Sequence, residues 1–256
     1  MRKKNRDVQT TGIIFRKTPF KETSLILEVF THELGKISVI AKGIKREKSK
    51  DLGLTEILNE LELVLHKTNE WYILKSATLI KSHLFEVDFY KNILMQAAVE
   101  IYRQLIIPEE DSKKLYELLI KYFNYLKQVN INGIAIFWRF LLRVFIISGI
   151  DLNVTSCVNC KKQEKNFMGY YPQKNGFICR NCYRPVFDSS IIKISNDVAF
   201  IFSNIYQIGN ILDKIEISKS TINQINRIFL IHLSEHFHKK FHLKSIELYE
   251  NNLSKT

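Results

Sequence analysis

Residues 1 to about 80 consist of short hydrophobic runs separated by polar, turn-prone residues. Runs of this length and composition are typical of β-strands, and the breaks between them are typical of turns. We predict turns at residues 17–20, 32–35 and 67–70. The predicted strands cover residues 12–15, 24–30, 36–41, 61–66 and 71–77. Five short strands indicate a small β-barrel, although a curled sheet of another topology would show the same pattern.

From about Asp88 the hydrophobic residues recur at i, i+3 and i+4, which is typical of amphipathic helices. A first predicted helix carries its apolar face over residues 93–105 and ends at Pro108. A second begins with the acidic residues 109–111, which suit the positive end of a helix dipole, and continues to about residue 126. Further helical patterns cover about 197–207 and 220–241.

The most apolar segment, residues 131–150, predicts another helix, with Gly149 as its C-cap. Its length suits a membrane span, but Arg139 and Arg143 lie in its middle at i,i+4 spacing and therefore on one face. We interpret it as a buried helix with one polar stripe. The chain starts with a hydrophilic segment, and no apolar signal region follows it, so we expect a cytoplasmic protein.

The patterns together predict an α+β fold: a β-barrel domain over residues 1–82 and an all-helical domain over residues 83–256. A cysteine-rich insert interrupts the helical domain at about residues 153–188. With 256 residues, of which 46% are hydrophobic, the chain is long enough to bury cores of this size.

All four cysteines fall in two Cys-x-x-Cys pairs, which are eighteen residues apart: Cys157, Cys160, Cys179 and Cys182. Two intervening residues make a tight turn that directs both sulfurs of a pair to one point, and the spacing between pairs is typical of four-thiolate zinc sites. Aromatic residues on either side of Asn175-Gly176 predict a hairpin that brings the pairs together. We therefore predict one structural zinc ion.

Other uses of the cysteines stay open. Disulfides would need an oxidising compartment, a redox pair would not need the second pair, and an iron–sulfur cluster also takes four thiolates. The cations Lys161, Lys162, Arg180 and Arg184 flank the cysteines. They either offset the negative charge of a four-thiolate metal site or contact DNA.

Positive charge is concentrated at the start of the chain. Residues 1–50 hold thirteen Lys and Arg against five acids, which is +8 of the total net charge of +12. Such a surface favours a polyanionic partner, because binding phosphates releases counterions. We predict that a basic loop between strands contacts the phosphates through Lys42, Lys45, Arg46 and Lys48, with contributions from Arg16, Lys17 and Lys36. Phe15, Phe20, Trp71 and Tyr72 are either stacking surfaces for bases or residues of the barrel core.

The motifs of common catalytic classes do not occur in the sequence. It contains no phosphate-binding Gly-x-x-x-x-Gly-Lys loop, no Gly-x-Ser-x-Gly elbow and no Gly-x-Gly-x-x-Gly fingerprint. The i,i+4 histidine pairs 232/236 and 238/242 lack the Glu of a zinc-protease motif. We therefore predict a binding protein rather than an enzyme, with an RNA-binding or transcription-associated zinc protein as the alternative to a DNA-binding one.

Several of these segments resemble the RecO family of bacterial DNA repair proteins. The resemblance lies in the order of the parts, in the two Cys-x-x-Cys pairs, and in segments 22–27, 30–31, 35–36, 41–43 and 45–46. Two positions depart from the family pattern. Lys161 stands where a glycine often follows the second cysteine, and Asn175 stands where the family often has the first of two glycines. Because Asn tolerates a left-handed backbone, we expect the turn at Asn175 to be kept.

The resemblance implies an OB-fold for the N-terminal barrel and the function of a recombination mediator. Such a protein binds single- and double-stranded DNA and anneals complementary strands. It also helps to load RecA onto DNA coated by single-stranded DNA-binding protein, together with RecR. The resemblance further implies that an acidic, apolar tail of a partner docks on the helical domain, at a position that the sequence does not locate.

Overall fold

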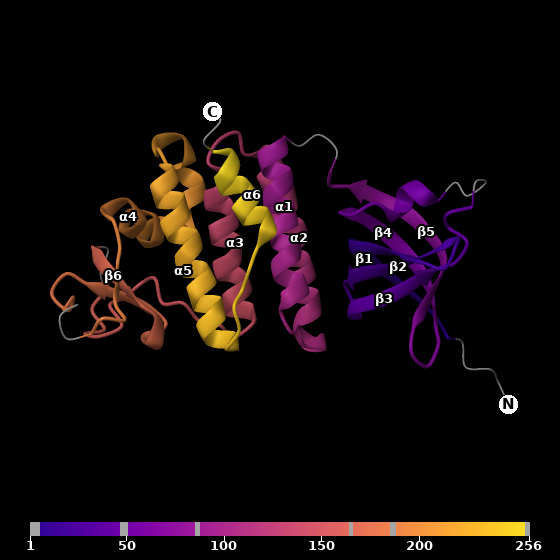
Figure 1. The fold of residues 1–256 in the computed structure, drawn as a ribbon, viewed down its shortest axis with the longest axis horizontal. Helices are drawn as coiled ribbons and strands as arrows, with labels where there is room; N and C mark the ends of the chain where they lie inside the picture. The colour runs from indigo at the N-terminus through magenta and orange to yellow at the C-terminus, as the bar shows by residue number, and fades with distance from the viewer. Residues whose placement is uncertain (1–5, 47–50, 85–87, 164–165, 185–187, 254–256) are drawn as a thin grey trace. The chain divides into compact units, whose positions relative to one another are not determined.

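The computed structural model describes residues 6–46, 51–84, 88–163, 166–184 and 188–253. By their contacts, the residues fall into two compact units, Met1–Asn92 with Ile101–Phe123, and Ile93–Glu100 with Asn124–Thr256 (Figure 1). The first unit therefore holds the β-rich region and also parts of two helices. A domain limit at residue 82 stays a prediction.

Five strands close into a barrel in the first unit (Figure 1). They are β1 (Asp7–Phe20), β2 (Ser24–Thr31), β3 (Gly35–Ala41), β4 (Asn59–Lys67) and β5 (Tyr72–Ser82), with a short 3₁₀ turn, η1 (Leu52–Thr55), before β4. Their order around the barrel is β1-β2-β3-β5-β4, and antiparallel pairing of β1 with β4 closes it. The parallel pairing of β3 with β5 completes an OB-like topology. The predicted barrel is confirmed.

Alternating side chains fill the barrel interior. Along β4, the residues Leu61, Leu63 and Leu65 are buried, while those between them are more exposed, as the two-residue period of a strand requires. The same alternation on the other strands gives one core. Its buried members are Ile14, Leu25, Leu27, Val29, Val39, Ala41, Ile44, Leu61, Leu63 and Leu65.

One predicted turn is wrong. Residues 17–20 continue β1, because Lys17 pairs with Leu27 and Phe20 pairs with Ser24, and the turn falls at residues 21–23 instead. Pro19 had suggested the turn, but a proline is tolerated where a strand needs no further partner. The pairing of β1 with β4 reaches only as far as Ile13, so the missing N–H of Pro19 interrupts no bond of that ladder.

An aromatic cluster joins the barrel to the helical residues of the first unit. The ring centroid of Phe30 lies 5.6 Å from that of Phe15 and 5.3 Å from that of Tyr102, which belongs to α1 (Phe89–Gln104). Tyr116 of α2 (Glu109–Gln128) packs on Phe30 from another side. The acidic residues 109–111 form the first turn of α2, as predicted. At the start of α1, Asp88 caps the helix by accepting a hydrogen bond from the amide of Lys91.

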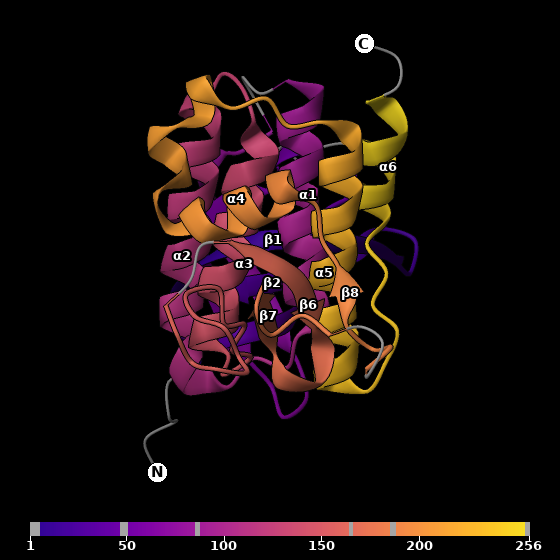
Figure 2. The same cartoon turned by 90° about the vertical axis from the view of Figure 1, so that its left-hand side faces the viewer.

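The second unit holds helices and a small sheet (Figure 2). The helices are α3 (Gly133–Ile147), α4 (Asn196–Asn204), α5 (Lys219–Phe237) and α6 (Lys244–Asn252), with 3₁₀ turns η2 (Pro172–Lys174), η3 (Ile205–Asn210) and η4 (Leu212–Lys214). The sheet has the order β7-β6-β8, formed by β6 (Phe167–Tyr171), β7 (Gly176–Cys179) and β8 (Ile192–Lys193). α4 packs against β6. The predicted helical region with a cysteine-rich insert is confirmed.

The apolar helix α3 is buried along most of its length, as predicted. Gly149 lies just beyond it with φ +69°, and the amide of Ile150 donates to the carbonyl of Phe145, which is the bonding of a glycine-terminated helix. In the part of the chain that the structure describes, no helix is both long and apolar enough to span a membrane.

The C-terminal helical prediction needs a correction. The helix expected to reach residue 241 ends at Phe237, because His238 adopts a left-handed conformation with φ 50°. The hydroxyl of Ser234 then accepts one hydrogen bond, from the amide of Phe241, which holds the segment after the helix against its last turn. A further helix, α6, follows and was not predicted from the sequence.

His232 belongs to α5 and points into the core of the second unit, where it contacts Tyr170 of β6 and the carbonyl of Ile150. It is 1% exposed. Its Nδ1 lies 3.1 Å from the hydroxyl of Tyr170, and its Nε2 lies 3.4 Å from the carbonyl oxygen of Ile150. These contacts fit a neutral ring that donates from Nε2 and accepts at Nδ1. Burial lowers the pKa of His232 to about 4, against the opposing effect of the Ile150 carbonyl.

We expect acid to destabilise the folded chain through His232. An unfolded histidine titrates near pH 6.5 and the folded one near 4, so its contribution is complete above about pH 6.5 and is lost as the pH falls towards 4. This difference between the unfolded and folded pKa values reduces the free energy of unfolding by about 3 kcal/mol once the pH is below both of them. Calorimetry of His232→Gln should show a smaller fall in melting temperature between neutral and acidic pH than the parent shows. His236→Gln, at an exposed position of α5, is the matched control, and equal pH profiles of the parent and His232→Gln would contradict the assignment.

Candidate metal centre and nucleic-acid interface

The four cysteines come together at one point of the second unit. Their sulfur atoms all lie within 4.8 Å of one another, and those of Cys160 and Cys179 are 3.9 Å apart. A tetrahedral ion with bonds of about 2.3 Å to sulfur separates its ligands by about 3.8 Å. None of the four forms a disulfide. Four thiol groups at this spacing could therefore hold one metal ion.

Two tight turns hold the pairs. In the first, the amide of Lys161 donates to the carbonyl of Cys157 across 2.8 Å, and in the second the amide of Cys182 donates to the carbonyl of Cys179 across 3.1 Å. Lys161 has φ 62°, in the left-handed region that favours glycine. The resemblance leads us to expect glycine at this position, and glycine would adopt this conformation without steric cost.

Replacing Lys161 by glycine should stabilise the chain. A left-handed residue with a side chain costs about 1–2 kcal/mol, part of which is offset by the greater freedom of glycine in the unfolded chain. We expect the melting temperature to rise by about 1–3 °C. Lys162→Gly is the matched control: it removes the same charge at a residue of ordinary φ and should lower the melting temperature. A lower melting temperature for Lys161→Gly would show that its side chain matters more than its backbone.

The pKa values of Cys157 and Cys179 differ because their surroundings differ. Burial acts to raise the pKa of Cys157, but amide groups of Cys179, Cys160 and Asn159 favour the thiolate more strongly and bring the pKa to about 6. Burial and the neighbouring thiols raise the pKa of Cys179 to about 12. One thiolate therefore forms readily, whereas a full set of thiolates needs a cation between them. This donor set fits a soft or borderline metal ion.

The predicted hairpin between the two cysteine pairs is present. β6 and β7 pair antiparallel, and Asn175 turns the chain with φ 51°, so the expected tolerance of Asn at this position is confirmed. Gly176 follows where there is no room for a side chain, since an added Cβ would lie 2.5 Å from Val158 and 2.8 Å from the carbonyl oxygen of Asn153. The hairpin thus packs directly on the loop that carries the first pair.

The basic loop after β3 is anchored at its centre. Ile44 is buried in the barrel core, and the amide of Lys45 donates to the carbonyl of Thr23. Gly43 turns the chain with φ 67°. On either side of this anchor the side chains of Lys42, Lys45 and Arg46 are exposed. Lys48, the fourth predicted contact of this loop, lies outside the described residues.

The other predicted phosphate contacts have partners within the first unit. Lys17 forms an ion pair with Glu56 at 2.6 Å, and Arg16 lies 3.6 Å from Glu28. Lys36 donates to the carbonyl oxygens of residues 102, 103 and 105 at distances of 3.1, 3.3 and 2.5 Å, which places its ammonium at the negative end of α1. Their roles as DNA contacts stay predictions, and the geometry favours the exposed loop over them.

The four candidate aromatic residues differ in exposure. Phe15 is 4% exposed and belongs to the aromatic cluster, so it offers no stacking surface. Phe20 and Tyr72 are half-buried, with the ammonium of Lys21 over the Phe20 ring. Trp71, at the turn before β5, is 40% exposed. Of the four, Trp71 offers the largest surface for a base.

Comparisons with known proteins match both halves of the chain. A family model described as "Recombination protein O N terminal" matches residues 1–83, and one described as "Recombination protein O C terminal" matches residues 86–245. The DNA repair protein RecO of Acetivibrio thermocellus is 25% identical over 238 residues, covering 91% of this chain and 93% of its own. That of Halalkalibacterium halodurans is 27% identical over 241 residues, covering 91% of each chain. That of Alkaliphilus metalliredigens is 28% identical over 190 residues, covering 73% of this chain and 76% of its own.

Proposed function

Because the chain belongs to the RecO family of DNA repair proteins, we propose that it is a recombination mediator. In this role it binds single- and double-stranded DNA and anneals complementary strands. It also assists the loading of RecA onto DNA coated by single-stranded DNA-binding protein, and it acts together with RecR.

The exposed cations of the basic loop are the observation that carries this proposal. Lys42, Lys45 and Arg46 project around a buried anchor on a closed barrel. A barrel of this class commonly binds single strands through a positively charged groove and exposed aromatic rings. Annealing brings two polyanions together, and a cationic surface lowers their repulsion without changing any covalent bond. The activity therefore requires no catalytic group.

We propose zinc as the ion held by the four cysteines, with a structural role. Four thiolates close the coordination shell and leave no position for a water nucleophile, which is the arrangement of structural zinc sites. The ion would hold the first cysteine loop against the hairpin of β6 and β7. Metal analysis of the purified chain tests this assignment, and iron with the absorption of an iron–sulfur cluster would replace it.

Strand annealing on coated DNA tests the proposed function. Complementary strands are coated with single-stranded DNA-binding protein, and duplex formation is followed by a fluorescent label after addition of the chain. We expect faster annealing without any added nucleotide and with both strands intact. No acceleration, or cleavage of a strand, would contradict a mediator. A parallel competition between single-stranded DNA and RNA separates it from an RNA-binding zinc protein, for which RNA would be the stronger competitor.

A further inference from the structure

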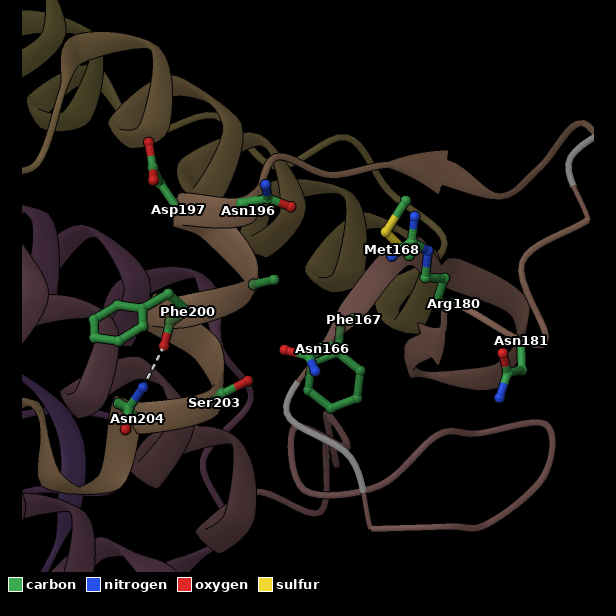
Figure 3. A pocket seen from close by; sticks show the side chains of 11 residues that line it. Asn166, Phe167, Met168, Arg180, Asn181, Asn196, Asp197, Phe200, Ser203 and Asn204 are labelled. Carbon is green, nitrogen blue, oxygen red and sulfur yellow. Dashed lines mark hydrogen bonds between the residues drawn. The ribbon is translucent and has the colours of Figure 1, made fainter.

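A cavity of about 1000 Å³ lies in the second unit between α4 and the cysteine hairpin (Figure 3). Asn196 and Ser203 of α4 lie on one side of it, and Met168 of β6 and Arg180 lie on the other. Its volume is at the upper end of the range for small-molecule sites and exceeds the needs of one nucleotide. The described residues that line it include Arg180 and Asn181, which lie between two of the cysteines, but no cysteine and no residue of the basic loop.

The lining has the chemistry of a site that reads a nucleobase. It combines side-chain amides, a hydroxyl and a carboxylate with an apolar wall, and amides both donate and accept hydrogen bonds, as the edge of a base does. Among the residues that the structure describes, the amides of Asn181 and Asn196 have no hydrogen-bond partner, and Arg180 forms no ion pair. Asp197 can accept from the amino group of a base. Phe200, which is 49% exposed, adds an aromatic surface.

Among the described residues that line the cavity, one is a cation, Arg180, and one is a carboxylate, Asp197. Lys161, Lys162 and Lys174 are further cations of the cysteine-rich insert, and they lie outside this lining. A strand that places a base in the cavity would bring an adjacent phosphate to Arg180. Arg180 suits a phosphate in particular, because its guanidinium is planar and can donate two parallel hydrogen bonds.

The cysteine cluster determines the position of one wall. Arg180 and Asn181 are the two residues between Cys179 and Cys182, so the turn that aims these sulfurs also sets the direction of both side chains. A metal ion bound to the cysteines would hold this turn in place. The site is therefore prepared by the same residues that bind the ion.

We propose that this cavity accepts an unpaired base of single-stranded DNA, with Arg180 on an adjacent phosphate. The proposal rests on the proposed function and adds to it a second contact, separate in sequence from the basic loop. A base within a duplex cannot enter, because its hydrogen-bonding edge and both faces are occupied. The cavity thus distinguishes single strands from duplex DNA, which the phosphate contacts of the basic loop do not.

Photo-crosslinking tests the proposal on the full, metal-loaded chain. A single-stranded oligonucleotide carrying 5-iodocytosine is bound and irradiated, and the linked peptides are identified by mass spectrometry. We expect links to peptides that contain Met168 or Phe200, suppressed by excess unlabelled single strand and not by blunt duplex. Ser203→Trp narrows the cavity next to Phe200 without changing the charge and should weaken these links. Arg180→Ala should weaken single-strand binding about five- to tenfold, whereas Arg184→Ala, an exposed arginine of the same insert outside the cavity, should not.

The outcomes separate this proposal from the general function. Metal content and circular dichroism of each variant show that it is folded. If the parent chain binds single strands but links only through barrel peptides, or if Ser203→Trp links as the parent does, the cavity is not a base site and the mediator function stands. If the parent does not bind single strands at all, the proposed function itself is wrong.

Discussion

Cys157→Ser should purify without the metal ion and with a less stable second unit. Cys157 is fully buried, and it is the cysteine whose surroundings most favour a thiolate, so a serine hydroxyl leaves the ion without a strong ligand. Structural zinc sites contribute roughly 10–16 kcal/mol to folding in small domains. We expect a loss of at least about 3 kcal/mol, a small part of that figure, measured by calorimetry together with metal analysis.

The first unit should be unaffected by this change. The barrel core contains no residue of the cysteine insert, so its melting transition should stay where it is in the parent. Lys162→Ser is the control, because it changes an exposed side chain beside the cluster and touches no sulfur ligand. A variant that keeps a full equivalent of metal, or a metal-free parent that melts like the loaded one, would show that the ion does not stabilise the fold.

The second large effect concerns the basic loop. The triple variant Lys42→Ala, Lys45→Ala, Arg46→Ala should bind single-stranded DNA far more weakly and with a flatter dependence on salt. Each phosphate contact contributes about 0.7 to the slope of log K against log salt concentration for single strands, so three contacts contribute about 2. At low salt this corresponds to a loss of affinity on the order of 100-fold. The loss should be the same for every DNA sequence, since these side chains read no base.

Fluorescence anisotropy at several salt concentrations measures both quantities. The matched control replaces three exposed lysines on α2, Lys113, Lys114 and Lys121, by alanine, so that the net charge falls by the same amount. If both variants lose the same affinity, binding follows total charge and the loop has no special role. If neither does, the loop is solvated and the phosphates bind elsewhere.

The sequence predicted those features that depend on neighbouring residues. The two-residue alternation along β4, the glycine after α3 and the cysteine pairs are local signals, and each has the expected structure. Local signals also produced the errors. Pro19 indicated a turn, because the neighbouring sequence does not show that β1 pairs with β4 only as far as Ile13. The end of α5 depends on the left-handed backbone conformation of His238, which the composition of this segment does not predict.

Features built from segments far apart in the sequence could not be predicted from the sequence patterns. The closure of the barrel joins β1 to β4 across some fifty residues, and an alternating pattern cannot distinguish it from an open sheet. Lys36 could not be distinguished from other surface cations in the sequence, because the carbonyl oxygens that accept its hydrogen bonds lie more than sixty residues further along the chain. The cavity beside α4 combines segments around residues 166, 180 and 200, of which only the middle one carries a recognisable motif.

The hydrogen bonds from Lys36 to the C-terminal end of α1 affect where the chain can be cut to express the barrel as a fragment. A fragment cut after residue 82 would remove the carbonyl acceptors of Lys36, the partner Arg103 of Glu28, and the tyrosines that cover Phe30. Uncovered rings on a small barrel invite self-association. A soluble version of the barrel therefore has to extend through α2, or carry polar replacements at the aromatic positions.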